Sequence, residues 1–300
     1  MSEATQNIIK TITYFDLFNY PLTSWELWRL ADTKKTYSEF SADLNNLAHP
    51  QIANQDGFYC LSGRADTLAE RQTRYNVSDR KFKRALAAAW WFSRLPWIKL
   101  VCLANQIGAH NLRAGGDLDF FIVTSPRRLW LSRLFLNSAL TILNLRPTDG
   151  KFSDTLCLSF WISDDNLNLA GYRLADDPYF RYWLAGLTPL YDRGWTYDKL
   201  IEANEWLVQE LPNWQRLKVL PRRHLKTSGR DRRPLQIFQP LERLAKKFQW
   251  LIMPDNLKAL ANHNTQVVIS DCVLKLHPTD RRQEFLEKYQ EKLNDSGLRI

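Results

Sequence analysis

The sequence predicts an α+β protein in which a mixed β-sheet with helices follows a small helical front and precedes a mostly helical region. Three observations support this. Apolar residues recur at helical spacing over residues 6–47, residues 97–135 read as strand, loop, acidic strand and helix, and helical spacing dominates beyond residue 165. The domains that we expect from these patterns are 1–65 for the front, 66–95 for a connecting helix, 96–170 for the core and 171–300 for the C-terminal region.

Composition narrows the class of protein. A chain of 300 residues can form two or three domains, and no apolar run reaches the roughly 18 residues that span a bilayer. The first ten residues are polar, so we expect a cytoplasmic protein with no membrane partner. The four cysteines lie far apart, which favours buried free thiols over a disulfide framework. A net charge of +9 permits a polyanionic partner.

The front reads as three helices and a hairpin. The first helix ends before Pro21, the second follows the cap Thr23, the third covers about 37–47, and Asp56-Gly57 is a strong hairpin signal. This pattern resembles a winged helix. In nucleic-acid-binding winged helices the third helix carries basic residues, whereas here residues 37–47 include two acids and no Lys or Arg. We therefore favour a packing or protein-interaction role over DNA reading.

Residues 64–94 predict one long helix with a basic outer face. The favoured interpretation is a solvated connecting helix; the alternative is a basic face directed at the acidic strand that holds a nucleotide or RNA. The basic residues are Arg71, Arg74, Arg80, Lys81, Lys83 and Arg84.

The core carries the candidate chemistry. Residues 98–103 read as a buried strand, a loop follows over 104–108, and Asp117 and Asp119 begin a second strand. Alternation places both carboxylates on one face of the sheet, where they can share a divalent cation. Ser125 is the expected cap of the next helix, with Pro126 at its first position.

These residues resemble the signature of the nucleotidyltransferase superfamily, which includes DNA polymerase beta and the CCA-adding enzymes. That signature is an apolar strand, a Gly-Ser pair opening a helix, about ten residues, and Asp-apolar-Asp on the next strand. Within the superfamily, the order of elements is similar to bacterial nucleotidyltransferase-domain proteins of unknown substrate. The resemblance implies a nucleotidyltransferase-type mixed sheet and transfer of a nucleoside monophosphate from an NTP to a hydroxyl acceptor.

The resemblance also implies site residues. Asp117 and Asp119 would bind Mg²⁺ or Mn²⁺ and act in catalysis, and Asn105, Gln106 and Gly108 would line the triphosphate loop. The Gly-Ser position falls on Asn105-Gln106, so the spacing is kept and the residues differ. A third carboxylate is expected near the strand at 156–162, which contains no acid.

The candidates for this third acid lie at the ends of that strand: Asp154, which we favour, and Asp164 or Asp165. A different function follows if none of them reaches the pair. The protein would then be a catalytically silent member of the fold, acting as a nucleic-acid- or protein-binding regulatory module. Without its flanking elements, the Asp-Leu-Asp sequence is also typical of turns and caps.

The C-terminal region is expected to contain helices over about 235–253 and 279–293, and a strand over 266–269. Tyr179, Tyr182 and Trp183 are at helical spacing and favour core packing over base stacking, and His277 is expected to pack in a turn. Residues 216–233 form a basic loop with six Arg, two Lys and one Asp, a net charge of +7. A solvated linker is favoured for this loop, with a phosphate-binding arm for nucleic acid as the alternative.

Overall fold

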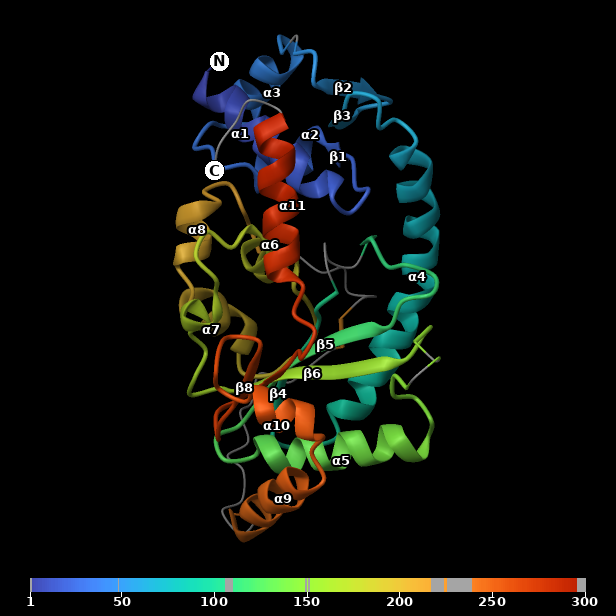
Figure 1. The fold of residues 1–300 in the computed structure, drawn as a ribbon, viewed down its shortest axis with the longest axis vertical. Coiled ribbons are helices and arrows are strands. Elements are labelled where there is room, and N and C mark those ends of the chain that lie inside the picture. Colours follow the sequence, from blue (N-terminus) through green and yellow to red (C-terminus); the bar gives the residue numbers. More distant parts are fainter. Residues whose placement is uncertain are drawn as a thin grey trace.

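The computed structural model describes residues 2–47, 49–105, 110–148, 150, 152–216, 224–225 and 239–295. In this part of the chain the fold is α+β, with a mixed six-stranded sheet in the order β7-β4-β5-β6-β9-β8 (Figure 1). Strands β5 and β6 are parallel, and the other neighbouring strands are antiparallel. The strands are β4 (Ile98–Leu103), β5 (Leu118–Thr124), β6 (Leu156–Ser163), β7 (Thr188–Asp192), β8 (Val267–Ile269) and β9 (Val273–Leu276).

Each face of this sheet is covered by its own apolar core. On one face, Phe121 and Phe160 pack with residues of α1 (Glu3–Asp16), α6 (Pro178–Gly186), α7 (Thr196–Glu202), α8 (Trp206–Glu210) and α11 (Arg282–Asp295). On the other face, Phe120 and Trp161 pack with α4 (Thr67–Phe92), α5 (Leu129–Ile142) and α9 (Gln239–Leu251). Side chains alternate along β5, so its neighbouring phenylalanines belong to different cores.

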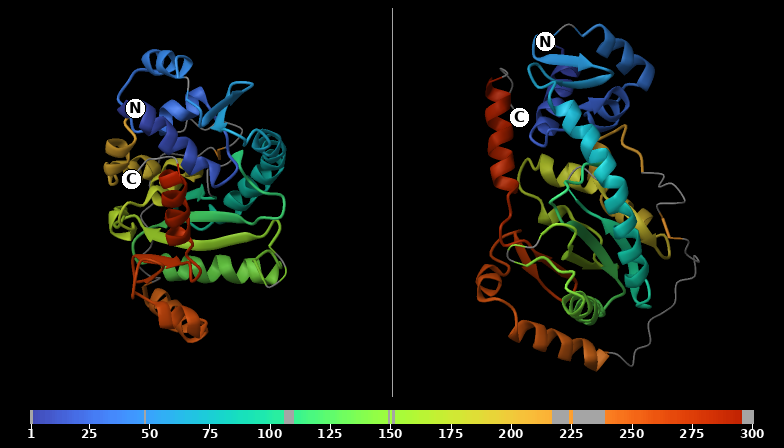
Figure 2. Two further views of the ribbon diagram at one scale, coloured as in Figure 1. Left: turned by 45° about the horizontal axis from the view of Figure 1, so that its top comes forward. Right: turned by 90° about the vertical axis from the view of Figure 1, so that its right-hand side faces the viewer.

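The front contains the elements that its sequence predicts. Helices α1, α2 (Ser24–Leu30) and α3 (Tyr37–Asn45) accompany a small sheet of β1 (Leu22–Thr23), β2 (Ile52–Gln55) and β3 (Phe58–Leu61). Both Asp56 and Gly57 have positive φ, 52° and 80°, as the two central residues of a tight hairpin turn require. Helix α11, the last helix in the described residues, packs against α1 of the front (Figure 2).

The long basic helix is present as α4, but its basic face is only partly solvated. Arg74 and Lys81 are 6% and 1% exposed. The guanidinium of Arg74 donates to the carbonyl of Phe18 (2.7 Å) and to Asn111 Oδ1 (2.9 Å). The expectation of a solvated face was therefore wrong for these two residues. Arg74 joins the front to the core, and Lys81 binds Gly116 and Asp154 of the core.

The C-terminal region adds three strands to the sheet, whereas only one was expected there. The expectation of a helix at β7 was wrong: Leu187 and Leu190 are at helical spacing with the residues of α6, but Leu190 belongs to a strand. Four of its five residues are buried, and a short strand buried on both faces has no period to distinguish it from a helix. Since β7 pairs with β4 and β9 pairs with β6, the expected division at residue 170 does not separate two structural units. In the described residues, no helix is both long and apolar enough to cross a bilayer.

Helix α5 begins later than expected. It starts at Leu129, and its first amides donate not to Ser125 but to Glu242 of α9: Trp130 N to Oε1 (2.7 Å) and Leu131 N to Oε2 (2.8 Å). The expected Ser125 cap was wrong because a carboxylate more than a hundred residues away occupies that role. A buried acceptor at a helix N-terminus satisfies amides that would otherwise lack partners.

We expect Glu242→Ala to lower the free energy of unfolding by about 1–2 kcal/mol, the usual cost of a lost N-cap. Urea unfolding measures this change. Glu242→Gln is the matched control, because its amide oxygen can still accept one of the two hydrogen bonds, and it should cost less. Equal stability of wild type and Glu242→Ala would contradict the tertiary cap.

Candidate functional site

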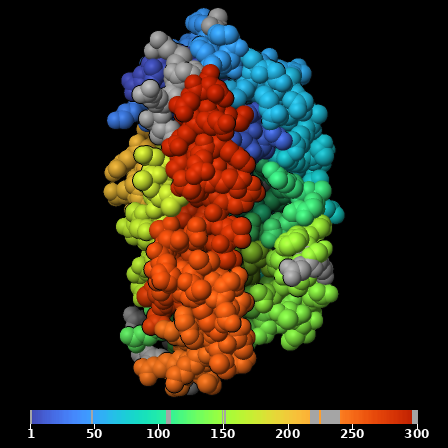
Figure 3. All heavy atoms as spheres, viewed as in Figure 1, coloured from blue at the N-terminus to red at the C-terminus, as the bar shows by residue number. Residues whose placement is uncertain are grey.

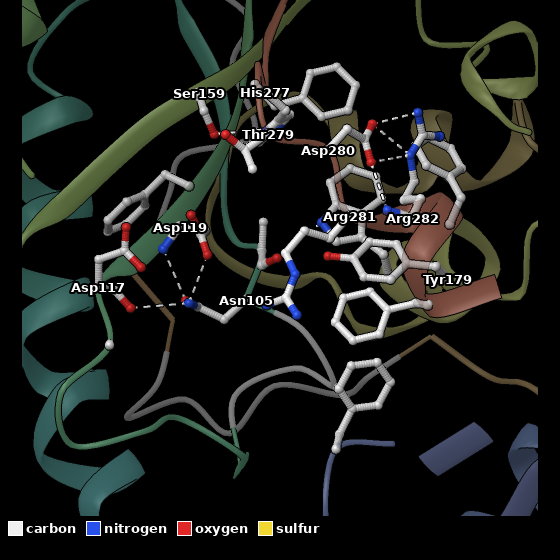
Figure 4. Close-up of a pocket in the computed structure, with 18 of the residues that line it drawn as sticks. Asn105, Asp117, Asp119, Ser159, Tyr179, His277, Thr279, Asp280, Arg281 and Arg282 are labelled. Carbon is white, nitrogen blue, oxygen red and sulfur yellow. Dashed lines mark hydrogen bonds and ion pairs between the residues drawn. The ribbon is translucent and has the colours of Figure 1, made fainter. Parts of the chain in front are cut away.

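The strand directions bring four strand ends to one edge of the sheet. Since β4 and β9 run antiparallel to β5 and β6 respectively, the C-terminal ends of β4 and β9 lie beside the N-terminal ends of β5 and β6. This edge therefore gathers Asn105 after β4, Asp117 and Asp119 at the start of β5, Cys157 at the start of β6, and His277 after β9. Polar side chains from four segments of the sequence thus lie at one edge of the sheet, and Figure 4 shows Asn105, Asp117, Asp119 and His277 among them.

A cavity of about 350 Å³ opens at this edge. Its floor is the sheet edge, and α6 and the start of α11 form its other walls (Figure 4). Its lining combines acidic, basic and aromatic side chains, which include Asn105, Arg113, Asp117, Asp119, Ser159, Tyr179, Trp183, Lys275, His277, Arg281, Arg282 and Phe285.

The two aspartates lie together, as the alternation predicts. One ligand atom each from Asp117, Asp119 and Cys157 lies within 4.8 Å of the other two. Burial, with the nearby charge of Asp117, raises the pKa of Asp119 to about 7. Burial also raises the pKa of Asp117, and the ammonium of Lys81 opposes that shift. The metal-free pair therefore retains a proton close to neutral pH.

This raised pKa makes the stability of the metal-free protein depend on pH. Below about pH 4 the Asp119 carboxyl is protonated in the folded and unfolded states; between about 4 and 7 only the unfolded chain releases the proton, so rising pH favours unfolding. We expect Asp119→Asn to stabilise the chelator-treated protein by about 1–3 kcal/mol at pH 8 and far less at pH 4. Urea unfolding of both proteins at pH 4 and pH 8 checks this. A stability difference between wild type and Asp119→Asn that is the same at the two pH values would contradict it.

Asn105 holds Asp119 in place. Its Nδ2 donates to Asp119 Oδ2 (2.9 Å) and to the carbonyl of Asp117 (3.1 Å), and its Oδ1 accepts from the amide of Asp119 (3.0 Å). This side chain is thus directed at the acidic strand. Gln106 and Gly108, the other expected loop residues, lie outside the described residues.

Asp154 does not form a cluster of metal-ligand spacing with Asp117 and Asp119, as a third acid would. Its carboxylate is 3.3 Å from Lys81 Nζ and 3.6 Å from Arg80, and in the described residues the cluster with metal-ligand spacing contains Cys157 instead. The buried Lys81 also donates to the carbonyl of Gly116. Its ammonium therefore lies within the acidic site, in line with the alternative reading of α4 as a basic helix directed at the acidic strand.

The other two candidates lie at the wrong end of β6. Asp164 and Asp165 follow its C-terminal end, whereas the site is at its N-terminal end, and eight residues of strand span about 25 Å. Asp164 is 3.6 Å from Lys99 Nζ, and Asp165 accepts from Ser163.

Cys157 lies beside Asp117 and Asp119, where a third acid was expected. It is the direct partner of Asp119 in the parallel β5–β6 ladder. Burial, then the charges of Asp119 and Asp117, raises the pKa of the thiol, so it stays protonated and donates to Asp119. The sequence interpretation of Cys157 as a plain buried thiol missed this role. Only the register of β5 against β6 shows that Cys157 lies beside Asp119, and a single sequence does not reveal that register.

The opposite wall carries the residues that follow β9. Burial, then the charge of Lys275, lowers the pKa of His277 to about 3, so its imidazole is neutral at pH 7. Its Nε2 is 3.4 Å from Ser159 Oγ. His277 directly precedes the turn at residues 278–279, and it also lines the cavity as a neutral hydrogen-bonding group.

The aromatic residues divide between the cavity and the core. Tyr179 and Trp183 line the cavity, where their rings stack on Phe285 (5.6 Å between centroids) and Phe160 (5.4 Å). Tyr182 packs against Tyr14 at 4.5 Å, in the core between α1 and α6. The expectation of core packing is therefore confirmed for Tyr182. Tyr179 and Trp183 also pack against an aromatic ring, but they line the cavity as well.

Little of the basic loop can be described. Arg216 pairs with Asp198 and lies 3.5 Å from Glu202, and His224 and Leu225 are also described. Residues 217–223 and 226–238, which hold the remaining Arg and Lys of the loop, lie outside the described residues.

Comparison of the chain with protein-family models, with curated proteins and with solved structures gives no significant match.

Proposed function

We propose that the cavity binds a nucleoside triphosphate together with Mg²⁺ or Mn²⁺, and that the protein transfers the nucleoside monophosphate to a hydroxyl acceptor. The observation that carries the proposal is the placement of two close carboxylates, Asp117 and Asp119, on the wall of a cavity of about 350 Å³ that also has basic and aromatic walls. A nucleotide needs these three kinds of surface, for its cation, its phosphates and its base.

The donor set fits a hard dication. Carboxylate oxygens are the ligands that Mg²⁺ and Mn²⁺ prefer, and Mg²⁺ is typically held by one or two carboxylates, waters and substrate phosphates. Asp117 and Asp119 would hold the ion. The protonated thiol of Cys157 is a poor ligand for either ion, so we assign it a hydrogen bond to Asp119. When bound, the cation would neutralise charge on the triphosphate and on the departing pyrophosphate.

The chain's own residues account for the rest of the binding. Asn105 fixes the orientation of Asp119 through two hydrogen bonds to that residue and a third to the carbonyl of Asp117. Arg113 and Arg281, which reach the cavity from the loop before β5 and from the start of α11, would attract the phosphates. Tyr179 and Trp183 offer aromatic surface to the base. His277, with a pKa of about 3, is too weak a base to take the acceptor's proton at neutral pH.

Paired isotope labels test the reaction. The protein is incubated with Mn²⁺ and each NTP in turn, labelled at the α- or the γ-phosphate, with cell RNA, a metabolite extract or the protein itself as acceptor. Transfer of a nucleoside monophosphate moves only the α-label, and Asp119→Asn should abolish it. Absence of nucleotide binding by the wild type in the presence of either cation would refute the proposal.

A second candidate function is favoured by one observation: the third metal-ligand position holds the thiol of Cys157 in place of an acid. The protein would then be a catalytically silent binding module that meets nucleic acid or a protein through the basic loop. Such binding should survive Asp117→Asn with Asp119→Asn, and should fall when Arg222, Arg223, Arg232 and Arg233 are changed to Gln. Equal binding by the loop variant would exclude this function.

A further inference from the structure

Helix α9 exposes an apolar stripe. Leu241, Leu244, Phe248 and Leu251 of the helix, with Ile252 directly after its end, are between 45% and 76% exposed and are called the α9 stripe below. Their spacing of three, four, three and one residues places them on one side of the helix. In a globular protein such a stripe normally faces the core, whereas this one faces outward.

The stripe faces outward because α9 docks through polar side chains. Glu242 and Gln249, 8% and 3% exposed, bind the backbone of α5: Glu242 caps its first amides, and Gln249 Nε2 donates to the carbonyl of Trp130 (2.7 Å). Ala245 is buried between them. These hydrogen bonds fix the rotation of α9 about its axis, so the stripe cannot turn inward without breaking them.

The charge that borders the stripe is positive. Arg243 and Lys247 are exposed and lie one turn apart beside it, followed around the helix by Trp250, which is 43% exposed. The one acid of α9, Glu242, is buried under α5. The next acids along the chain are engaged by lysines: Asp255 with Lys258 (3.3 Å) and Asp271 with Lys246 (2.6 Å).

The position of α9 suits a flat partner. The helix lies across one end of the molecule, away from the front (Figure 2). In the space-filling view, α9 and the following α10 (Asp255–Leu260) make up that end of the visible face (Figure 3).

We propose that the α9 stripe inserts into the surface of a membrane that contains anionic lipids. An outward apolar face of Leu, Ile and Phe with Arg, Lys and Trp at its border is the pattern of an interfacial helix, which lies in the headgroup region and does not cross the bilayer. The basic border complements anionic headgroups, and the chain's net charge of +9 adds to that attraction.

A second copy of the chain fits the stripe less well. It would bring two equally basic borders together, and α9 offers no exposed acid to pair with them. The sequence expectation of no membrane partner rested on the absence of spanning segments, a criterion that does not detect interfacial helices.

Vesicle flotation with the full chain tests the proposal. We expect the protein to float with phosphatidylcholine vesicles that contain about a third phosphatidylglycerol, and at least tenfold less with phosphatidylcholine alone. Leu244→Glu with Phe248→Glu should reduce binding to the anionic vesicles at least tenfold. Arg243→Gln with Lys247→Gln should reduce it severalfold and weaken its dependence on salt.

The matched control is Trp91→Glu with Trp195→Glu, which changes two exposed apolar residues elsewhere and should leave flotation unchanged. Urea unfolding confirms that each variant remains folded. Failure of the wild type to float, or unchanged flotation of the stripe variant, would overturn the proposal. Light scattering would also overturn the proposal if the wild type forms a dimer, the stripe variant is a monomer and neither binds vesicles. That result would assign the stripe to a second copy of the chain. Nucleotide binding should be the same in all variants, because the inference does not rest on the proposed function.

Discussion

Asp119→Asn is expected to weaken Mn²⁺ binding at pH 8 about 100-fold and to reduce nucleotide transfer about 1,000-fold. The change removes one of the two negative charges that would hold the cation. Two unit charges about 4 Å apart at the edge of a protein interact by about 4 kcal/mol, and about 2.7 kcal/mol already corresponds to a 100-fold change in affinity. Isothermal titration with Mn²⁺, with and without an NTP, measures the binding, and the labelled-nucleotide assay measures transfer.

Cys157→Ser is the matched control for that experiment. Serine can still donate a hydrogen bond to Asp119 but has no sulfur. If Cys157 only donates to Asp119, its replacement should change Mn²⁺ affinity less than about threefold, a difference under 1 kcal/mol. Equal losses from Asp119→Asn and Cys157→Ser would mean that the thiol is a ligand and that the site prefers a softer metal than proposed.

Arg282→Met is expected to lower the free energy of unfolding by about 3–5 kcal/mol. The Arg282 side chain is 4% exposed and pairs with Asp177 (3.1 Å) and Asp280 (2.7 Å), whose side chains are 2% and 7% exposed. Without the guanidinium, both carboxylates would be left buried with fewer partners. Asp177 also caps α6 by accepting from the amide of Phe180 (2.8 Å), so the loss would extend to a wall of the cavity.

The neighbouring arginine provides the control. Arg281 has a side chain that is 56% exposed and pairs with the partly exposed Glu284 at 2.7 Å. Exposed ion pairs contribute at most about 1 kcal/mol, so Arg281→Met should leave the urea midpoint nearly unchanged. A similar loss in both variants would show that the buried network does not hold α11 to the rest of the molecule.

The elements that depend only on local sequence patterns could be predicted from the sequence. The hairpin at Asp56-Gly57, the long helix α4 and the acidic strand β5 each depend on neighbouring residues, and the structure contains all three. Asp117 and Asp119 face the same way because a strand alternates, a rule that needs only their spacing.

The parts that depend on distant partners could not be predicted. Cys157 enters the site only through the register of β5 against β6, and Glu242 caps α5 only because α9 packs there. Arg74 and Lys81 look like a solvated face until their partners, Asn111 and Asp154, are known. Strand β7 is buried on both sides, so its sequence carries no period to identify it.

The central claim is that Asp117 and Asp119 hold a divalent cation beside a nucleotide, and anomalous diffraction from crystals grown with Mn²⁺ and a non-hydrolysable NTP analogue tests it most directly. We expect a manganese peak about 2.2 Å from carboxylate oxygens of both aspartates, with phosphate oxygens completing its coordination and the base near Tyr179 and Trp183. Crystals that contain bound nucleotide and manganese away from these carboxylates, or an empty cavity at saturating concentrations of both, would contradict the claim.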